Sequence, residues 1–184
     1  MKILFYACLL ITPLLFAKDS QDISNPLNNI FNYYEYTNYF SSSGQLTPKQ
    51  IPILRDNEFE RIIYIAFLDQ KNAVSNEDRL VIDHGMQFIY IPVEWNSPRK
   101  KDFYLFTNIM LNQPKVRTLL HCQANYRASV FSFLHRVINE NINILEAKLT
   151  LNKIWKPNKV WKNFIFDILN ENNISPFCKG CKWD

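Results

Sequence analysis

Cys122 and Arg127, a cysteine and an arginine separated by four residues, are the residues of this chain best suited to covalent chemistry. A largely apolar, strand-like run (residues 117–120) precedes them, and a helix-like segment (residues 129–139) follows. A cysteine at a strand-to-helix turn faces free backbone N–H groups and the positive end of the helix dipole, which favour the thiolate. The same N–H groups bind oxyanions, and a guanidinium matches two phosphoryl oxygens. The pattern therefore predicts a nucleophile, an oxyanion cradle and a fixed cation.

One segment, residues 121–129, resembles the phosphate-binding loop of cysteine-dependent protein tyrosine phosphatases, especially their dual-specificity-like branch. It is similar in particular to bacterial tyrosine-phosphatase-like proteins related to the beta-lactamase-hydrolase-like phosphatase domains, whose loop reads His-Cys-x4-Arg. The likeness covers roughly residues 30–170 and includes Ser-Ser-Gly-Gln at 42–45, Tyr-Ile-Pro-Val-Glu-Trp at 90–95 and Trp-Lys-Pro-Asn-Lys-Val-Trp at 155–161.

The resemblance implies hydrolysis of a phosphomonoester through a phospho-cysteine, with Cys122 as nucleophile and Arg127 on the phosphate. It assigns substrate binding to the remaining loop residues, Gln123, Ala124, Asn125, Tyr126, Ala128 and Ser129. It also gives His121 a supporting role, in which hydrogen bonds from the ring hold the loop. The Ser129 hydroxyl is expected either to donate to the cysteine sulfur or to be only a polar group at a helix start. The implied partner is a phosphorylated small molecule or a phosphoprotein, and neither a cofactor nor a metal ion is expected.

The loop is one residue shorter than the Cys-x5-Arg pattern of the wider phosphatase family. Either Ala128 occupies the arginine position and Arg127 stands one residue early, or the loop is a tighter cradle. A Cys-x4-Arg loop also resembles that of some rhodanese sulfurtransferases. A sulfurtransferase or thiol-redox protein is therefore one alternative function, and a catalytically inactive module that binds an anion or a partner is another. Because the loop has no glycine, Asn125 is the expected carrier of a positive φ.

A phosphatase also needs an acid that protonates the leaving oxygen. In the family this acid is an aspartate on the loop that follows the strand corresponding to residues 87–93. Here that loop reads Glu-Trp-Asn-Ser-Pro, and its nearest carboxyl, Glu94, is the predicted acid. Asp102 is expected instead in the first turn of the following helix, where it satisfies the helix dipole.

Strand-like and helix-like segments alternate along the chain, which predicts an α/β fold with a largely parallel sheet flanked by helices and a C-terminal helical cap. The predicted strands are residues 39–43, 61–67, 87–93 and 117–121. The predicted helices are residues 47–56 with Thr47 as N-cap, 76–84, 101–111, 128–140, 145–154 and 160–170. Ligands of such sheets bind beyond the carboxyl ends of the strands, where Cys122 and Glu94 would both lie. Trp155 and Trp161 are expected to pack the cap against the core.

The amino terminus, residues 1–17, reads as a secretory signal, with Lys2 before an apolar stretch that ends at Ala17. This predicts a periplasmic or secreted bacterial protein with no stable membrane insertion after cleavage; an uncleaved N-terminal membrane anchor is the alternative. Residues 18–29 read as a flexible lead-in, residues 30–172 as the phosphatase-like domain and residues 173–184 as a tail. In an oxidising compartment Cys178 and Cys181 would pair and leave Cys122 free.

The composition agrees with one enzyme-sized domain. A chain of 184 residues, of which 47% are apolar, can bury a full core. Its three glycines argue against glycine-rich nucleotide-binding loops. The formal charge of +4 is scattered along the chain and forms no arginine-rich face, so nucleic acid is not a predicted partner.

Overall fold

Five strands form one sheet, in the order β1-β2-β5-β3-β4, in the computed structural model, which describes residues 25–112 and 115–183. The strands are β1 (Tyr34–Thr37), β2 (Phe40–Ser43), β3 (Arg61–Tyr64), β4 (Gln87–Tyr90) and β5 (Thr118–His121). The last four run parallel to one another, and β1 pairs antiparallel with β2 at the sheet edge. The predicted α/β fold with a largely parallel sheet is confirmed.

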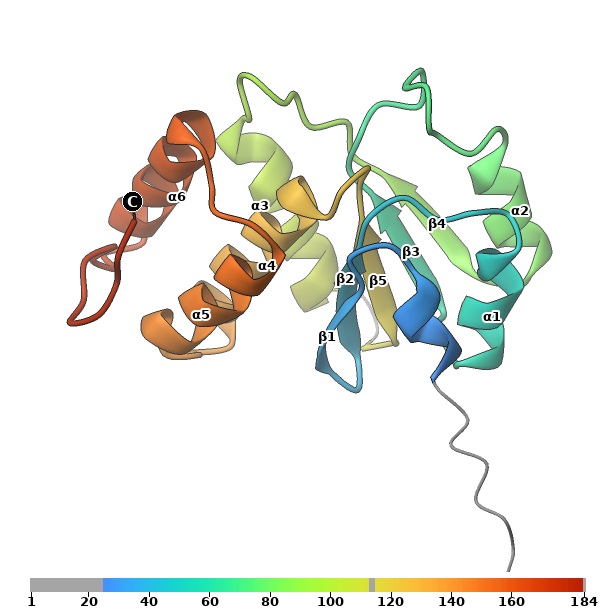
Figure 1. The fold of residues 1–184 in the computed structure, drawn as a ribbon, viewed down its shortest axis with the longest axis horizontal. Coiled ribbons are helices and arrows are strands. Elements are labelled where there is room, and N and C mark those ends of the chain that lie inside the picture. Colours follow the sequence, from blue (N-terminus) through green and yellow to red (C-terminus); the bar gives the residue numbers. More distant parts are fainter. Residues whose placement is uncertain (1–24, 113–114, 184) are drawn as a thin grey trace, which may run out of the picture.

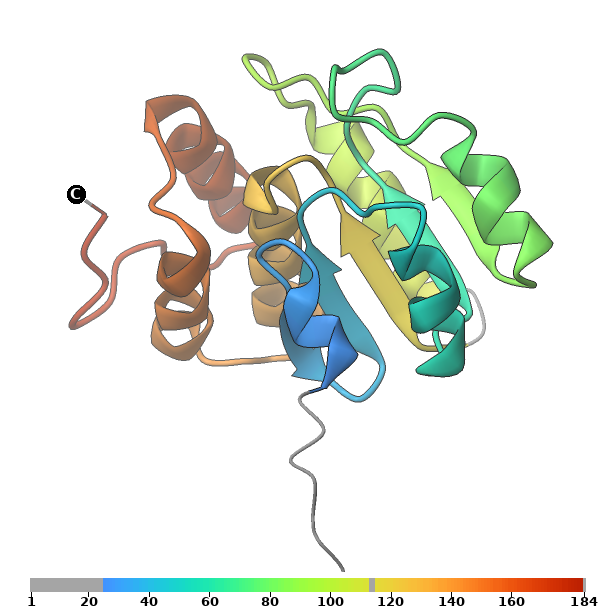
Figure 2. The same cartoon turned by 45° about the vertical axis from the view of Figure 1, so that its right-hand side comes forward.

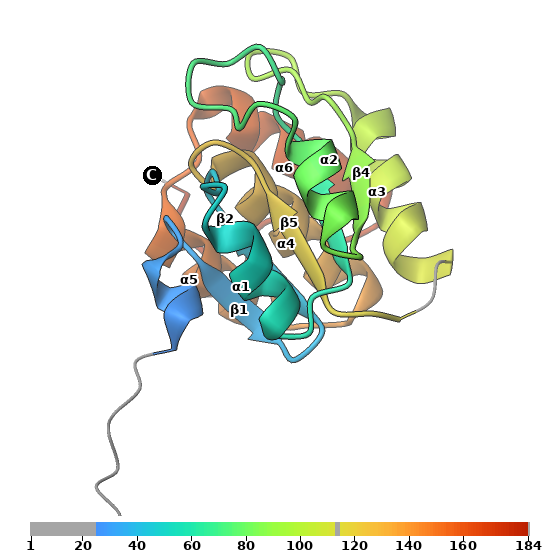
Figure 3. The same ribbon diagram turned by 90° about the vertical axis from the view of Figure 1, so that its right-hand side faces the viewer.

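Helices cover both faces of this sheet (Figures 1 and 2). On one face lie α1 (Gln50–Asp56) and α2 (Glu77–Asp83), which stand in front of the sheet in Figure 3. On the other face lie α3 (Lys100–Asn112) and α4 (Tyr126–Asn139), and α5 (Ile144–Ile154) and α6 (Lys159–Glu171) pack outside α4 as the predicted cap.

Two apolar clusters hold these layers together, one on each face of the sheet. Successive side chains of a strand point to opposite faces. Ile62 and Leu119 accordingly join the cluster under α1 and α2, whereas Ile63 and Leu120 join the larger cluster under α3 and α4. This double coverage requires strands that are apolar on both faces, and all four residues of β5 are buried.

Several element boundaries differ from the predicted ones. The predicted strand 87–93 ends at Tyr90, shortly before Pro92, which lacks the N–H needed to extend the ladder. Helix α1 begins at Gln50 rather than directly after Thr47, although the Gln50 side chain accepts a hydrogen bond from the Thr47 N–H at 2.8 Å, as in half of a capping box. Strand β1 was not predicted, since its residues are alternately half-buried and exposed rather than apolar.

The domain extends beyond both predicted limits. A 3₁₀-helix, Pro26–Asn29, buries Leu27 completely, so this part of the predicted flexible lead-in belongs to the core. The predicted signal (residues 1–17) and residues 18–24 lie outside the described residues. In the tail, Cys178 and Cys181 form a disulfide, and the Trp183 ring packs edge-on against Phe133 and Phe166. No helix in the described part of the chain is long and apolar enough to cross a membrane.

Candidate active site

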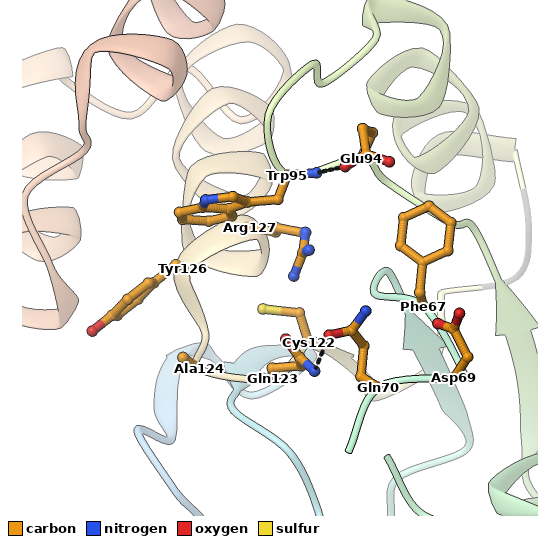
Figure 4. A pocket seen from close by; sticks show the side chains of 10 residues that line it. All are labelled: Phe67, Asp69, Gln70, Glu94, Trp95, Cys122, Gln123, Ala124, Tyr126 and Arg127. Atoms are coloured by element: carbon orange, nitrogen blue, oxygen red, sulfur yellow. Dashed lines mark hydrogen bonds between the residues drawn. The ribbon is translucent and has the colours of Figure 1, made fainter. Parts of the chain in front are cut away.

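A pocket of about 600 Å³ opens where β3, β4 and β5 end, and Cys122 lies in its wall (Figure 4). The loops that follow these three parallel strands contribute its lining residues: Phe67, Asp69 and Gln70; Glu94 and Trp95; Cys122, Gln123, Ala124, Tyr126 and Arg127. Parallel strands end on the same edge of a sheet, which is why residues so far apart in sequence meet here.

The cysteine loop, residues 122–125, joins β5 to α4. The Cys122 N–H donates to the carbonyl of Ser43 at the end of β2 at 3.3 Å, which anchors the start of the loop in the sheet. At its end, Asn125 adopts a φ of 64°, and α4 begins at the next residue. The predicted positive φ at Asn125 is thereby confirmed, since asparagine is the residue after glycine that best tolerates this conformation.

The carbonyl groups in the middle of the cysteine loop point away from the pocket. The Gln45 N–H donates to the Gln123 carbonyl at 3.0 Å, and Nδ2 of Asn32 donates to the Ala124 carbonyl at 3.1 Å. In a trans peptide the following N–H points opposite to the carbonyl, so the N–H groups of Ala124 and Asn125 point away from Gln45 and Asn32. The first N–H groups of α4, which have no partner inside the helix, extend this row of donors. The loop is therefore built as an oxyanion cradle.

The segment before β1 and the turn after β2 brace this cradle from outside. Nδ2 of Asn125 donates to the Asn32 carbonyl at 2.6 Å, so the two asparagines hold each other's segments. A Cβ atom on Gly44 would lie 2.6 Å from Phe31 Cδ1 and 3.1 Å from the Gln123 carbonyl oxygen, so only glycine fits this approach. The sequence resemblance includes residues 42–45, but no local pattern predicts that Asn32 braces the cysteine loop.

Arg127 lies in the first turn of α4, and its guanidinium extends over Cys122 into the pocket (Figure 4). Its Cζ is 5.3 Å from the ring centroid of Trp95, a cation–π arrangement that holds the side chain in place. Its Nε is buried and has no hydrogen-bond partner among the described residues. Ala128 is fully buried in the core instead. Of the two alternatives for the arginine position, the geometry agrees with a short loop served by Arg127.

Two carboxyl groups lie at the pocket. Glu94, the predicted acid, lines it, but its Oε1 accepts the N–H of Trp95 at 3.0 Å instead of pointing at Cys122 (Figure 4). Asp69 lines it from the loop after β3 and was not predicted, although its place just beyond a parallel strand was a usable signal. Asp102 lies in the first turn of α3 and pairs with Arg99 at 2.9 Å, as expected of a structural residue.

Three predicted binding residues direct their side chains elsewhere. Asn125 turns to Asn32, Ala128 lies in the core and Ser129 is 1% exposed. The Ser129 Oγ donates to the carbonyl of Tyr126 at 3.0 Å and accepts the indole N–H of Trp155 at 3.1 Å. Its proton is therefore engaged away from the cysteine sulfur, and of the two roles expected for Ser129 the geometry agrees with a polar group at the helix start. Loop residues Gln123, Ala124 and Tyr126 do line the pocket.

His121 also differs from its predicted role. Its side chain is fully buried, and Nε2 lies 3.3 Å from Oε1 of Glu77, a residue of α2. Within the described residues, its ring makes no hydrogen bond to the cysteine loop. Burial lowers the pKa of His121 to about 3, so the imidazole is neutral near pH 7.

The cap helices support the pocket through tryptophans. The Trp155 ring stacks on Tyr126 with centroids 4.5 Å apart, and Nε1 of Trp161 donates to the Trp95 carbonyl at 3.1 Å. Both tryptophans thus pack the cap against the core, as predicted, and each contacts a residue that lines the pocket. No group of His, Cys, Asp and Glu suited to a metal ion occurs among the described residues.

Comparison with known proteins places this geometry in context. No protein-family model and no curated protein matches the sequence. Among solved structures, the chain is similar to a DUF442 protein from Shewanella putrefaciens CN-32 that is described as a candidate phosphatase. The two share 27% identity with a TM-score of 0.73, over 82% of this chain and 98% of that one.

Two more distant structures share the fold. The core catalytic domain of the PP-IP phosphatase SIW14 from S. cerevisiae, in complex with citrate, is 13% identical with a TM-score of 0.62, over 77% of this chain and 93% of that one. TpbA from P. aeruginosa, in complex with pTyr, is 10% identical with a TM-score of 0.56, over 66% of this chain and 72% of that one. The chain therefore has the fold of protein-tyrosine-phosphatase-like phosphatases.

Proposed function

We propose that this protein hydrolyses a phosphomonoester through a phospho-cysteine intermediate. Sγ of Cys122 attacks phosphorus, the bond to the leaving oxygen breaks, and that oxygen takes a proton. Water then attacks phosphorus, the S–P bond breaks, and phosphate and the thiolate are regenerated. One observation carries the proposal: Cys122 and the Arg127 guanidinium converge on one pocket of about 600 Å³ at the start of α4.

Each part of the cradle has a role in that reaction. The N–H groups of Ala124, Asn125 and the first turn of α4 would bind the phosphoryl oxygens, and the charge that grows on them in the transition state meets donors already in place. Arg127 would add two parallel hydrogen bonds from its planar fork. Because Trp95 and the α4 backbone fix the guanidinium, little reorganisation is needed when the substrate binds.

The charge of the pocket favours a substrate with one phosphoryl group. The charged residues that line it are one cation, Arg127, and two carboxylates, Asp69 and Glu94. A molecule with several phosphates would bring its further negative charges close to these carboxylates. A phosphorylated small molecule or a phosphoprotein with a single group at the site fits this lining better. We assign protonation of the leaving oxygen to Glu94, whose carboxyl is free to turn toward that oxygen once its hydrogen bond from the Trp95 N–H opens.

The experiment is a comparison of two turnover assays on the reduced, purified protein. Para-nitrophenyl phosphate should be hydrolysed, vanadate should inhibit, and Cys122→Ser should abolish turnover because a serine hydroxyl has no base here to activate it. Turnover of thiosulfate and cyanide without phosphatase activity would assign the protein to the sulfurtransferases, the rival that the four-residue spacing supports. Vanadate binding without either activity would indicate a binding module.

We further propose that the protein is exported. The apolar stretch that ends at Ala17 motivates this, and the Cys178–Cys181 disulfide fits an oxidising compartment. N-terminal sequencing of protein from the native host should start near Lys18. Recovery of intact Met1 in the cytosolic fraction would refute export, and recovery of intact Met1 in the membrane fraction would favour the N-terminal anchor.

A further inference from the structure

A carboxyl and an imidazole form a buried pair next to the cysteine loop. Glu77, at the start of α2, and His121, at the end of β5, have fully buried side chains with Oε1 and Nε2 3.3 Å apart. Neither residue lines the pocket, and the reaction proposed above uses neither of them. Because His121 directly precedes Cys122, this pair can influence the nucleophile without touching the substrate.

The two facing atoms require a proton between them. Neither Oε1 of Glu77 nor Nε2 of His121 has a hydrogen-bond partner elsewhere in the described part of the chain. A carboxylate oxygen and an unprotonated ring nitrogen are both acceptors and cannot satisfy each other. Buried polar atoms in folded proteins are nearly always paired. At 3.3 Å, one shared proton pairs both atoms at once.

Burial decides which of the two groups carries that proton. It raises the pKa of Glu77 to about 7, against a smaller opposing effect of the hydrogen bond from Gln45. It lowers the pKa of His121 to about 3. Both shifts favour the neutral forms, because each charged form would lose its hydration in the core. With both groups neutral and the imidazole proton on Nδ1, the carboxyl donates and Nε2 of His121 accepts.

The other oxygen of Glu77 ties this pair to the cradle. Oε2 accepts a hydrogen bond from Nε2 of Gln45 at 3.2 Å, and the backbone N–H of Gln45 is the one that holds the Gln123 carbonyl outward. The Tyr64 hydroxyl donates to Oε1 of Gln45 at 3.2 Å, and the Tyr64 ring lies 4.7 Å from that of His121. Glu77 thus links α2 to His121, which precedes Cys122, and, through Gln45, to the Gln123 carbonyl of the cysteine loop.

We propose that Glu77 is a positioning residue of the active site, which as a neutral carboxylic acid donates to Nε2 of His121 and accepts from Gln45. The proposal rests on the proposed function, since the geometry that it maintains is that of the phosphoryl-transfer loop. When Glu77 loses its proton, a negative charge appears behind an anion-binding cradle, whichever ring nitrogen of His121 carries the imidazole proton. Anion affinity and turnover then fall on the alkaline side.

The other groups around Glu77 do not produce this change. His121 of β5 faces Glu77 directly, and the charge of Glu77 also acts on Tyr64 of β3, which in turn interacts with Tyr90, Cys122 and Arg127. Burial raises the pKa of Tyr64, which stays neutral, and Arg127 is permanently cationic. Deprotonation of the proposed acid Glu94 would also lower turnover, so the signature of Glu77 is an alkaline loss that disappears in Glu77→Gln.

The test uses the isosteric variant Glu77→Gln. Its amide can donate to His121 and accept from Gln45, but it cannot ionise. At pH 6 its kcat/KM and vanadate affinity should lie within about twofold of wild type, because both hydrogen bonds are retained. Above pH 7 it should keep activity that wild type loses. Glu77→Leu removes both bonds and should lower kcat/KM roughly tenfold or more at every pH.

Two results with Glu77→Gln would overturn the proposal. A loss at pH 6 as large as that of Glu77→Leu would mean that the pair is ionic and that His121 carries the proton. If Glu77→Gln lost activity above pH 7 as wild type does, a group other than Glu77 would be responsible for that loss. Glu140→Gln is the matched control, because Glu140 lies 3.7 Å from Nε2 of a second buried histidine, His135, away from the pocket. Glu140→Gln should leave the pH dependence of kcat/KM and of vanadate affinity unchanged.

A measurement on the wild-type protein keeps the inference independent of turnover and of variant folding. The ¹³C resonance of the Glu77 carboxyl should titrate with a midpoint near 7, and the His121 ring should stay neutral down to pH 5. A carboxyl already ionised at pH 6 would refute the positioning role. If the titration is as expected but no phosphate ester is hydrolysed, the proposed function fails, whereas the conclusion that Glu77 is a protonated, buried carboxyl remains.

Discussion

The cysteine loop and the rim of the pocket are built in contrasting ways. In the loop, the carbonyls of Gln123 and Ala124 and the side chain of Asn125 are each held by a residue distant in sequence. At the rim, by contrast, the Glu94 carboxylate accepts a hydrogen bond from the N–H of its own neighbour, Trp95. Under the proposed function, the braced loop would bind the phosphoryl oxygens that every substrate shares, and the rim would face the part that varies between substrates.

This contrast separates the effects expected from mutations. Changes in the loop should lower turnover of every substrate alike, because all substrates share the phosphoryl group. Changes at the rim should depend on the leaving group. The following substitutions test that division, from the largest expected effect to the smallest.

Arg127→Lys should lower kcat on the order of 1000-fold with all phosphate esters. Lysine retains the charge but loses the planar fork that is aimed at the transition-state oxygens. Steady-state kinetics with an aryl and an alkyl phosphate provide the measurement. Arg136→Lys is the matched control, since Arg136 lies on the same helix, 4.9 Å from the Tyr36 ring and away from the pocket. A comparable loss in the control would mean that α4 packing, not phosphate binding, explains the effect.

Glu94→Gln should lower kcat for an alkyl phosphate on the order of 100-fold, because an alkoxide needs a proton to leave. With para-nitrophenyl phosphate the loss should be small, since nitrophenolate leaves unaided. Asp69→Asn is the paired variant on the opposite loop. If Asp69→Asn produced the leaving-group dependence and Glu94→Gln did not, the acid would be Asp69.

Gly44→Ala should lower kcat/KM about tenfold for all substrates and reduce the free energy of unfolding by about 1–3 kcal/mol. The added methyl group would meet the Phe31 ring at 2.6 Å and press on the Gln123 carbonyl, which turns one cradle N–H. Urea unfolding and kinetics report the two effects. Gly85→Ala is a control: Gly85 has a φ of 73° with no atoms within 4 Å of a new Cβ, so stability should fall while kcat/KM does not.

Asn32→Gly should lower kcat/KM a few-fold, which corresponds to roughly the net free energy of one hydrogen bond. Glycine tolerates the φ of 48° at this position and removes only the donor to the Ala124 carbonyl. Asn173→Gly, at a φ of 58° near the end of α6, is the control and should not alter kinetics. An unchanged kcat/KM in Asn32→Gly would show that the loop keeps its conformation without this brace.

Much of the fold could be predicted from local patterns. The apolar strands, the helices between them and the parallel order follow from periodicity and alternation, which depend on neighbouring residues. The exceptions are the edge strand β1 and the 3₁₀-helix Pro26–Asn29, whose residues carry no strong pattern. Their positions depend on partners, since β1 exists by pairing with β2 and Leu27 is buried by packing against distant elements.

The candidate site likewise has features that the sequence predicts and features that it does not. The types and spacing of Cys122, Asn125 and Arg127 suffice to predict a nucleophile, a positive φ and a cation, because a strand-to-helix turn imposes them locally. The roles of Asn32, Asp69 and Glu77 could not be read from the sequence, since each depends on a contact across the sheet. The sequence left two roles open for the Ser129 hydroxyl, and the structure shows it donating to the Tyr126 carbonyl and accepting from Trp155, 26 residues away.

The sequence by itself thus determined the reactive segment and the α/β alternation around it, because both follow from short-range stereochemistry and hydrophobic periodicity. Only the tertiary structure decided that Arg127 rather than Ala128 faces the pocket, that two carboxyls line the rim, and that a buried acid lies behind the loop. Those outcomes depend on which segments the parallel sheet brings together and on which groups lose water there. Burial and long-range hydrogen bonding are properties of the packed chain.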